Sequence, residues 1–290
     1  MPDGMPMHPI DAHTKLCAII GRPVSHSLSP ALHNAAFQSE RRNIVYLAFE
    51  VEEVGAFLSG MRSMPGFLGL SVTIPHKIAV MEHLDEIEPL AQQVGSVNTI
   101  LNRDGRLFGY TTDGLGALRA LEEAGVSLSG KRVLMLGSGG AARAVAFAIA
   151  QKNEIAGLTI LGRTRANVET LAENIAESSS ATPATGEIEA DLERAMLEHD
   201  IVIQGTPVGM EGVGEGQSCI PARYLRAEQT IFDMVYRPLK TQLIRDAESA
   251  GCATILGTEM LLYQAALQYE IWTETRAPVA IMREALLSRI

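Results

Sequence analysis

The stretch Lys131-Arg-Val-Leu-Met-Leu-Gly-Ser-Gly-Gly-Ala-Ala142 decides how the fold of this chain is interpreted. Its first half is an apolar run typical of a buried strand, and the alanine-rich residues 141–150 that follow favour a helix. Between them, the loop fits the G-x-G-x-x-A pattern, whose glycines allow a tight turn and a close approach of backbone N–H groups to a pyrophosphate. The order of strand, glycine loop and helix predicts a dinucleotide site at the helix N-terminus, contacted by Gly137, Ser138, Gly139, Gly140 and Ala141.

The next predicted strand, Leu158–Leu161, indicates which dinucleotide is bound. A cofactor with a free ribose 2′-hydroxyl favours Asp or Glu at the end of this strand. The chain instead reads Gly162-Arg-Thr-Arg165. Arginine suits a phosphate through its planar fork of N–H donors, and Thr164 adds a hydroxyl. The sequence therefore predicts NADP over NAD, with Arg163, Thr164 and Arg165 near the 2′-phosphate.

Outward from this unit, segments rich in β-branched residues alternate with helical patterns along the whole chain. The alternation predicts an α/β fold, with a parallel, doubly wound Rossmann-type sheet after Asp113 and a further α/β region before it. In the earlier region we expect strands at 17–20, 46–49 and 67–73, a helix at 78–84, and a hairpin around Asp104-Gly105. Ser29 and Pro30 predict a helix start, with Ser29 as N-cap.

Composition narrows the function classes. The 290 residues suit two domains or one large domain, and a formal net charge of −10 argues against a nucleic-acid binder. No apolar run approaches the roughly 20 residues that a membrane helix needs, and residues 1–13 lack the features of a signal peptide. The cysteines Cys17, Cys219 and Cys252 are far apart in the sequence, which fits reduced thiols. The histidines form no cluster with metal-ligand spacing, so no metal site is predicted. We therefore expect a cytoplasmic protein without membrane, nucleic-acid or metal partners.

Two segments offer groups for the reduction of a carbonyl, namely Ser71-Val-Thr-Ile-Pro-His-Lys77 and Thr111-Thr-Asp-Gly114. A lysine can stabilise or protonate the alkoxide that forms when hydride arrives, and a carboxylate can orient the ammonium group. Lys77 and Asp113 are therefore the candidate catalytic pair. Short donors and acceptors elsewhere suit a small polyhydroxylated acid: Ser27, Ser29, Thr73, Asn98, Asp113 and Gln264.

Together these residues resemble the shikimate dehydrogenase family, over almost the whole chain from Cys17 to Gln268. The resemblance is carried by Ser27-Leu-Ser-Pro30, Val72-Thr-Ile-Pro-His-Lys77, Gly95-Ser-Val-Asn-Thr99, Thr112-Asp-Gly114, the glycine loop, Arg163-Thr164, Asp233-Met-Val-Tyr236 and residues 257–264. It implies the catalytic pair named above, adds Tyr236 to the substrate contacts, and adds Met234 and Gly257 to the cofactor contacts. It also implies that residues 1–112 bind substrate and are completed by C-terminal helices 257–290. Residues 113–256 would bind NADP, with the active-site cleft between the two domains.

The chain departs from the commonest family pattern at a few positions. Ser71 and Thr111 stand where many members carry asparagine. In the phosphate loop, Gly162 and Asn167 stand where members often have asparagine and a basic residue, and Arg165 is a candidate for the second positive charge.

The resemblance implies reversible, NADP-linked reduction of 3-dehydroshikimate to shikimate in the biosynthesis of chorismate and the aromatic amino acids. One alternative is a quinate/shikimate dehydrogenase that uses NAD or NADP. Another is a non-catalytic sensor of a shikimate-pathway ligand, although such a protein has no reason to keep Lys77, Asp113 and an intact glycine loop. The sequence does not decide which of the pair transfers the proton. It also leaves the oligomeric state open, and a homodimer is one of the states it allows.

Overall fold

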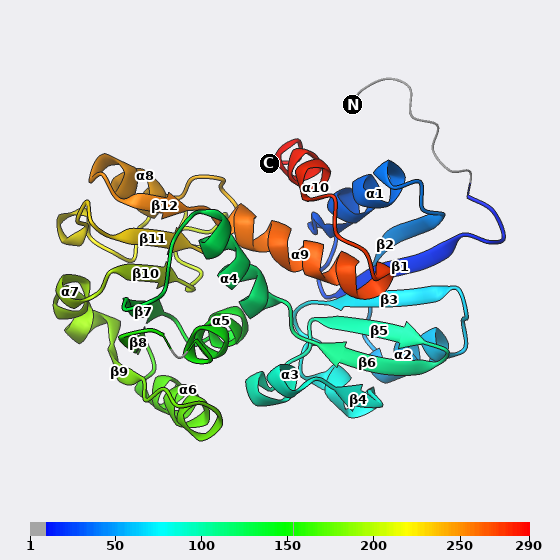
Figure 1. Cartoon of the computed structure of the whole chain (residues 1–290), viewed down its shortest axis with the longest axis horizontal. Coiled ribbons are helices and arrows are strands. Elements are labelled where there is room, and N and C mark those ends of the chain that lie inside the picture. The colour runs from blue at the N-terminus through cyan, green and yellow to red at the C-terminus, as the bar shows by residue number, and fades with distance from the viewer. Residues whose placement is uncertain (1–9, 153) are drawn as a thin grey trace. The chain divides into compact units, whose positions relative to one another are not determined.

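The computed structural model describes residues 10–152 and 154–290, and the chain divides into two compact units. Unit 1 ends at Thr112 and includes Gln264–Arg289, and unit 2 spans Asp113–Tyr263 (Figure 1). The chain therefore returns to unit 1 within the helix α9 (Gly257–Thr273), whereas the sequence placed this junction at the start of that helix.

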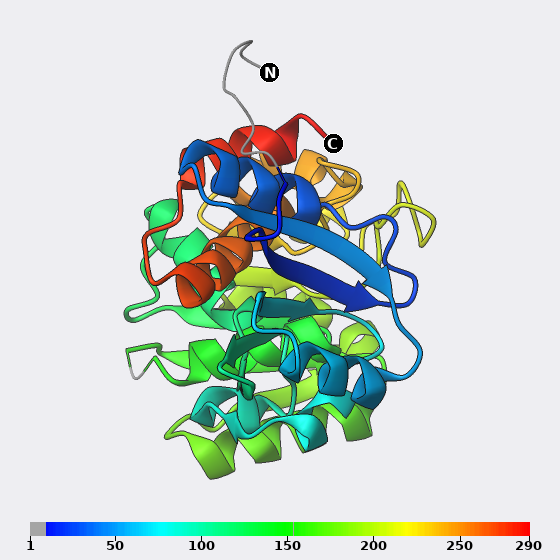
Figure 2. The same ribbon diagram turned by 90° about the vertical axis from the view of Figure 1, so that its right-hand side faces the viewer.

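Unit 1 is built on a six-stranded mixed sheet in the order β2-β1-β3-β5-β6-β4. β1 is parallel to both of its neighbours, β2 and β3, β4 is parallel to β6, and β5 is antiparallel to both β3 and β6. The strands are β1 (Lys15–Gly21), β2 (Ile44–Glu50), β3 (Phe67–Val72), β4 (Glu86–Ile87), β5 (Thr99–Arg103) and β6 (Arg106–Tyr110). The helices are α1 (Ser29–Ser39), α2 (Val54–Arg62), η1 (Ala79–His83), α3 (Pro89–Val94) and α10 (Val279–Leu287), and α10 packs beside α1 (Figure 2).

The hairpin predicted in unit 1 is confirmed. Asp104 and Gly105 form its turn with φ angles of 53° and 82°, the left-handed pair that a two-residue hairpin loop requires. The predicted helix at 78–84 is wrong in type, because Ala79–His83 forms a 3₁₀ helix. A segment of five residues is at the length where the tighter 3₁₀ turn replaces an α-helix.

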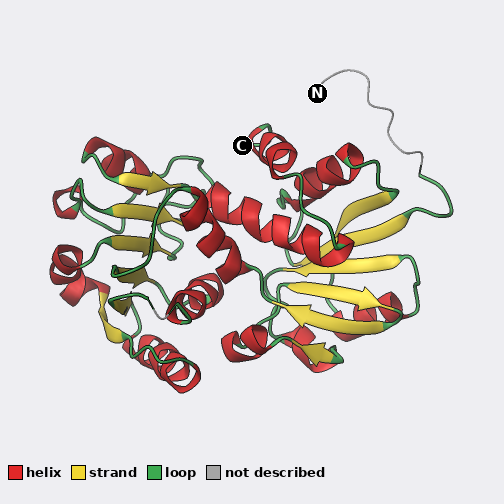
Figure 3. Ribbon diagram, in the orientation of Figure 1, coloured by secondary structure: helices red, strands yellow, loops and turns green. Residues whose placement is uncertain are grey.

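Unit 2 contains the predicted doubly wound sheet, with six parallel strands in the order β12-β11-β10-β7-β8-β9 (Figure 3). Its strands are β7 (Arg132–Leu136), β8 (Gly157–Gly162), β9 (Ala184–Glu187), β10 (Ile201–Gln204), β11 (Thr230–Asp233) and β12 (Ala253–Ile255). Its helices are α4 (Asp113–Glu123), α5 (Gly140–Ala150), α6 (Arg165–Ser178), α7 (Ile188–Glu198), η2 (Ala222–Tyr224) and α8 (Gln242–Ser249), followed by the first part of α9. Hydrophobic patterning does not indicate β9, because its residues are small or polar and three of the four are exposed.

Close helix packing in unit 2 explains two features of its sequence. A Cβ atom at Gly114 would lie 2.3 Å from the carbonyl oxygen of Ala144, so α4 can cross α5 only with glycine at this position. All of α5 from Ala144 to Ala150 is buried, which accounts for its lack of charged residues beyond Arg143. Among the described residues, no helix is both long and apolar enough to cross a membrane, and the three cysteines are free thiols.

Asp233 is a fully buried carboxylate at the end of β11. It accepts hydrogen bonds from the Thr241 hydroxyl (2.6 Å) and the Val235 backbone N–H (3.0 Å), and Thr241 in turn caps α8. Burial raises the pKa of Asp233 from 3.8 to about 6, since these two hydrogen bonds offset only part of the lost hydration.

We expect the free energy of unfolding of Asp233→Asn to increase relative to that of the wild type as the pH rises. Between pH 3.8 and about 6 the native carboxyl keeps a proton that the unfolded chain has lost, so the free energy of unfolding falls as pH rises through this window. At about 1.4 kcal/mol per pKa unit, the ionised Asp233 costs the native state about 3 kcal/mol at pH 7. Urea unfolding of both proteins at about pH 4 and pH 7 measures the change in their difference. A difference that is the same at both pH values would contradict the assignment.

Candidate active site

In unit 1 the predicted substrate residues converge where β1 and β3 end and β5 begins. The backbone N–H of Val72 donates to the carbonyl of Asn98 (2.8 Å), and the N–H of Thr73 donates to the carbonyl of Ile20 (2.9 Å). These bonds place Thr73 and Asn98 on neighbouring strand ends. Gly21 leaves room for this packing, because a Cβ there would lie 2.4 Å from the Thr73 methyl group.

Ser27 and Ser29 lie on the turn that leads from β1 into α1. The sequence prediction of Ser29 as N-cap is wrong by one residue, because Leu28 occupies the cap position and no side chain caps the helix. The Ser29 backbone N–H instead interacts with the Ser27 hydroxyl (3.3 Å). Ser29 is buried and Ser27 is half-buried, so neither hydroxyl is an ordinary surface group.

Lys77 lies in the turn between β3 and η1, and its side chain is half-buried. Its carbonyl accepts the backbone N–H of Val97 (2.9 Å), which brings it next to the segment that carries Asn98. One residue earlier, the buried imidazole of His76 contacts the Val51 carbonyl through Nε2 at 2.7 Å. These two bonds attach the lysine turn to the ends of its neighbouring strands.

Asn98 is buried and holds the segment that leads to Asp113. Its Oδ1 accepts the backbone N–H of Thr112 (2.8 Å), and its Nδ2 donates to the Thr112 hydroxyl (3.0 Å). Asp113 follows Thr112 directly and opens α4 in unit 2, where the helix dipole favours a carboxylate in the first turn. The half-buried Glu88 fixes the same segment by accepting the N–H of Thr111 (2.7 Å), and burial raises the pKa of Glu88.

Gln264 lies on α9, in the part of that helix that belongs to unit 1. It is buried, and the i, i+4 spacing puts it on the same helix face as Gln268. Gln268 donates through Nε2 to the Thr99 hydroxyl (3.0 Å), so this face of α9 is directed toward the strand ends.

In unit 2 the glycine loop follows β7 and opens α5 as predicted. Gly137 has a φ of +108°, which strongly favours glycine, and a Cβ there would also lie 3.0 Å from the Gly205 carbonyl oxygen. Gly139 and Gly140 are exposed with open space where a Cβ would be, and no side chain caps the helix. Ala142 is fully buried, and its methyl group would lie 2.8 Å from a Cβ at Gly205. The first turn of α5 is therefore open to an anionic group, as dinucleotide binding requires.

The predicted phosphate residues lie at the end of β8. Arg163 and Thr164 are exposed, and the guanidinium of Arg163 makes no hydrogen bond or ion pair within the described part of the chain. Arg165 differs, since its Nε donates to Glu169 Oε1 at 2.8 Å on the same helix, and this bond raises its pKa. Gly162 has a packing reason to be glycine, because a Cβ there would lie 2.5 Å from Val168.

The remaining predicted cofactor residues line the same edge of the sheet of unit 2. A Cβ at Gly257 would lie 2.6 Å from the carbonyl oxygen of Met234, and a Cβ at Gly205 would lie 3.2 Å from the Met234 sulfur. Gly257 is thus required by close backbone packing, whatever it binds. Tyr236 follows in the loop after β11, where it is half-buried and burial raises its pKa.

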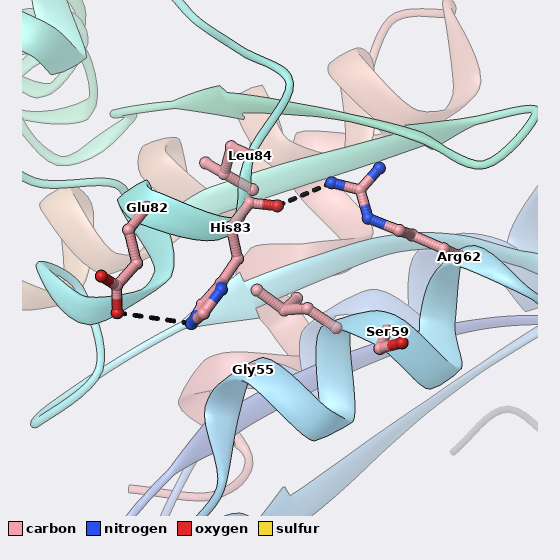
Figure 4. Close-up of a pocket in the computed structure, with 7 residues that line it drawn as sticks. Gly55, Ser59, Arg62, Glu82, His83 and Leu84 are labelled. Atoms are coloured by element: carbon pink, nitrogen blue, oxygen red, sulfur yellow. Dashed lines mark hydrogen bonds and ion pairs between the residues drawn. The ribbon is translucent and has the colours of Figure 1, made fainter.

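One surface pocket lies away from all of these residues. It lies between α2 and η1 and is lined by Gly55, Leu58, Ser59, Arg62, Glu82, His83 and Leu84 (Figure 4). Arg62 donates to Asp85 (2.5 Å) and to the His83 carbonyl (2.7 Å), so its charge is already balanced by a carboxylate. None of the predicted site residues lines this pocket.

Sequence reasoning missed two groups of residues. Gly205 and Thr206 follow β10 and lie against Gly137, and Gln204 fixes their loop by contacting both the N–H and the carbonyl of Thr206. A Gly-Thr-Pro sequence directly after a buried strand is the signal that was available. Tyr46, Thr99 and Gln268 connect to Asn98 by hydrogen bonds, and only the spacing of Gln268 from Gln264 hinted at this.

Comparisons with known proteins match the chain to one family along most of its length. Residues 19–100 match the shikimate dehydrogenase substrate binding domain, residues 119–218 the shikimate/quinate 5-dehydrogenase family, and residues 257–287 the shikimate 5′-dehydrogenase C-terminal domain. The NADP(+)-dependent shikimate dehydrogenase of Symbiobacterium thermophilum is 43% identical over 282 residues, which cover 95% of either chain.

Solved structures give the same result. A shikimate dehydrogenase crystallised with NADP⁺ has a TM-score of 0.92 and 39% identity, covering 99% of either chain. The shikimate 5-dehydrogenase of Listeria monocytogenes, in complex with shikimate and NAD, has a TM-score of 0.91 and 38% identity, covering 98% of this chain and 100% of that one. With identity at this level over nearly the full length, the chain belongs to the shikimate dehydrogenase family.

Proposed function

We propose that this protein is an NADP-dependent shikimate dehydrogenase, which reversibly reduces 3-dehydroshikimate to shikimate in the biosynthesis of chorismate and the aromatic amino acids. The observation that carries the proposal is the cluster at the strand ends of unit 1, where Thr73, Lys77 and Asn98 are held by backbone hydrogen bonds to neighbouring strands. A lysine on a turn beside segments that carry hydroxyl and amide groups suits a small polyhydroxylated substrate with a carbonyl group. Full-length relatives with this activity support the same substrate.

In the proposed reaction Lys77 stabilises the alkoxide that forms at the ring carbonyl, and the proton reaches this oxygen from the pair Lys77 and Asp113. Ser27 and Ser29 hold the substrate carboxylate, since both lie at the entry to α1, where the Ser29 backbone N–H contacts the Ser27 hydroxyl. Hydroxyls of the ring are bound by Thr73, Asn98, Gln264 and Tyr236. Residues 1–112 with the C-terminal helices form the substrate domain in this scheme.

Unit 2 fits NADP. When bound, this cofactor supplies the hydride. The open first turn of α5 at Gly139 and Gly140 would hold the pyrophosphate, and the exposed guanidinium of Arg163 would hold the 2′-phosphate. Thr164, Arg165, Met234 and Gly257 complete the proposed cofactor contacts, with Arg165 contributing less because Glu169 already pairs with it.

A quinate/shikimate dehydrogenase that accepts NAD is the alternative favoured by one comparison, a quinate dehydrogenase of Corynebacterium glutamicum in complex with NAD, which is 28% identical with a TM-score of 0.89. The absence of a carboxylate in the segment after β8, Arg163-Thr164-Arg165, favours NADP for this chain. We further propose that the protein works in the cytoplasm as a small-molecule enzyme. A homodimer stays a proposal that size-exclusion chromatography with light scattering would test.

A single assay tests substrate and cofactor together. Nicotinamide reduction is followed by absorbance with four pairings, shikimate or quinate with NADP or NAD. We expect kcat/KM to be highest for shikimate with NADP, by at least about tenfold over each other pairing. A higher value with quinate, or with NAD, would replace the proposal by the alternative. Tight shikimate binding without turnover in any pairing would indicate a ligand sensor.

A further inference from the structure

A chain of buried hydrogen bonds runs through unit 1 behind the predicted substrate residues. The Tyr46 hydroxyl contacts Ser71 Oγ (2.6 Å), Ser71 contacts Gln268 Oε1 (2.8 Å), and Gln268 Nε2 contacts Thr99 Oγ1 (3.0 Å). Thr99 Oγ1 then contacts Asn98 Oδ1 at 2.8 Å. All five side chains belong to residues that are no more than 3% exposed. Because water does not reach these groups, the loss of one hydrogen-bond partner leaves a buried polar group unsatisfied, which is energetically costly.

One unambiguous donor sets the direction of every bond in this chain. The backbone N–H of Thr112 can only donate, so it defines Oδ1 of Asn98 as the acceptor and Nδ2 as the donor to the Thr112 hydroxyl. Thr99 must then donate its hydroxyl proton to Oδ1.

The same logic continues outward. Because Thr99 donates its only proton to Asn98, it must accept from Gln268, whose Nε2 also faces the Asn98 carbonyl (3.3 Å). Oε1 of Gln268 is then left to accept from Ser71, and Ser71 accepts from Tyr46. No hydrogen bond in this network can exchange its donor and acceptor unless the neighbouring bonds do so as well.

The outer end of the chain is fixed by packing. The Tyr46 ring stacks on His33, with ring centroids 4.5 Å apart and planes 16° apart. Burial lowers the pKa of His33 to about 3, so this ring is neutral and places no charge beside the Tyr46 hydroxyl.

We propose that the Tyr46–Ser71–Gln268–Thr99 chain is a positioning network that, together with Thr112, holds the Asn98 side-chain amide in place, and so sets the affinity for the ring hydroxyl that Asn98 binds. The inference rests on the proposed function and deepens it. It also gives Ser71 a role, since its hydroxyl both accepts and donates within the network. Ser71, Tyr46, Thr99 and Gln268 are thus positioning residues that act through Asn98.

Gln268→Met is the sharpest test, because it keeps the length of the side chain but removes both the acceptor for Ser71 and the donor to Thr99. Without that donor the Thr99 hydroxyl is free to turn away from Asn98, and the Asn98 amide loses one of the bonds that hold it. We expect the shikimate KM to rise about tenfold, equivalent to about 1.4 kcal/mol. The NADP KM should change less than about twofold and kcat less than about threefold.

Tyr46→Phe is the second variant, since it removes one hydroxyl and keeps the ring on His33. We expect a smaller rise in shikimate KM, about threefold, because Ser71 can still donate to Gln268. Tyr269→Phe is the matched control: it removes one hydroxyl from the same helix, which accepts a hydrogen bond from Arg42 Nε (3.0 Å) outside the network. It should lower the melting temperature and leave the shikimate KM unchanged.

Steady-state kinetics and thermal melting of the four proteins separate the outcomes. An unchanged shikimate KM in Gln268→Met, with an active wild type, overturns the inference and leaves the proposed function standing. If Gln268→Met does not fold, an unchanged KM in Tyr46→Phe overturns it instead. A KM rise in Tyr269→Phe equal to that in Gln268→Met would reduce the network to general packing. A wild type inactive on shikimate overturns the proposed function and this inference with it.

Discussion

Lys77→Met lowers kcat for shikimate oxidation by about 10³-fold and changes the shikimate KM by less than about threefold. The expected loss combines charge stabilisation and proton transfer, each of which contributes about 10²- to 10³-fold or more at such sites. The KM stays nearly constant because hydroxyl and amide groups, not Lys77, make most of the proposed ground-state contacts. Methionine keeps the length of the half-buried stem, so packing in the turn after β3 is preserved.

Two further variants sharpen this test. Lys77→Arg keeps the positive charge but holds its proton too firmly to exchange it, so a partial recovery would measure the electrostatic share alone. Lys15→Met removes an exposed lysine at the start of β1 in the same unit and should leave kcat unchanged. Wild-type turnover in Lys77→Met would remove Lys77 from the catalytic pair, and Asp113 would have to act without it.

Much of unit 2 followed from sequence because its signals are local. The glycine loop joins adjacent elements, and its glycine at φ +108° is required by the turn itself. Parallel strands buried on both faces form continuous apolar runs, so the runs before the glycine loop and at Leu158–Leu161 indicated β7 and β8. The edge strand β9 was missed because polar, partly exposed residues carry no such signal.

The site in unit 1 was less accessible, because its geometry depends on contacts between distant residues. Ser71 and Gln268 are 197 positions apart, yet their side chains share a hydrogen bond. No local pattern distinguishes such a pair from a buried serine and a helical glutamine. Similarly, Ser29 preceding Pro30 fitted an N-cap, and only the structure shows that the helix cap is Leu28. The chemical types of the site residues were predictable, and their partners were not.

Arg163→Ala lowers kcat/KM for NADP by about 10²-fold and changes the value for NAD by less than about threefold. The guanidinium is exposed, and among the residues that the structure describes it has no carboxylate partner, so its full charge is available to a 2′-phosphate. A charge-assisted, bidentate contact of this kind contributes up to about 3 kcal/mol. NAD lacks the phosphate and loses nothing comparable, so the ratio of the two values reports this contact alone.

Arg165→Ala is the matched control, since it removes the same charge two residues further on. The side chain of Arg165 is 70% exposed and bonded to Glu169, so binding a phosphate would mean giving up or sharing that pair. We therefore expect only about a threefold loss with NADP, and Glu169→Gln should raise NADP affinity slightly by releasing Arg165. Equal losses with NADP and NAD in Arg163→Ala would mean that Arg163 supports the loop and not the phosphate. A larger loss in Arg165→Ala than in Arg163→Ala would show that the cofactor displaces Glu169, and would make Arg165 the principal phosphate ligand.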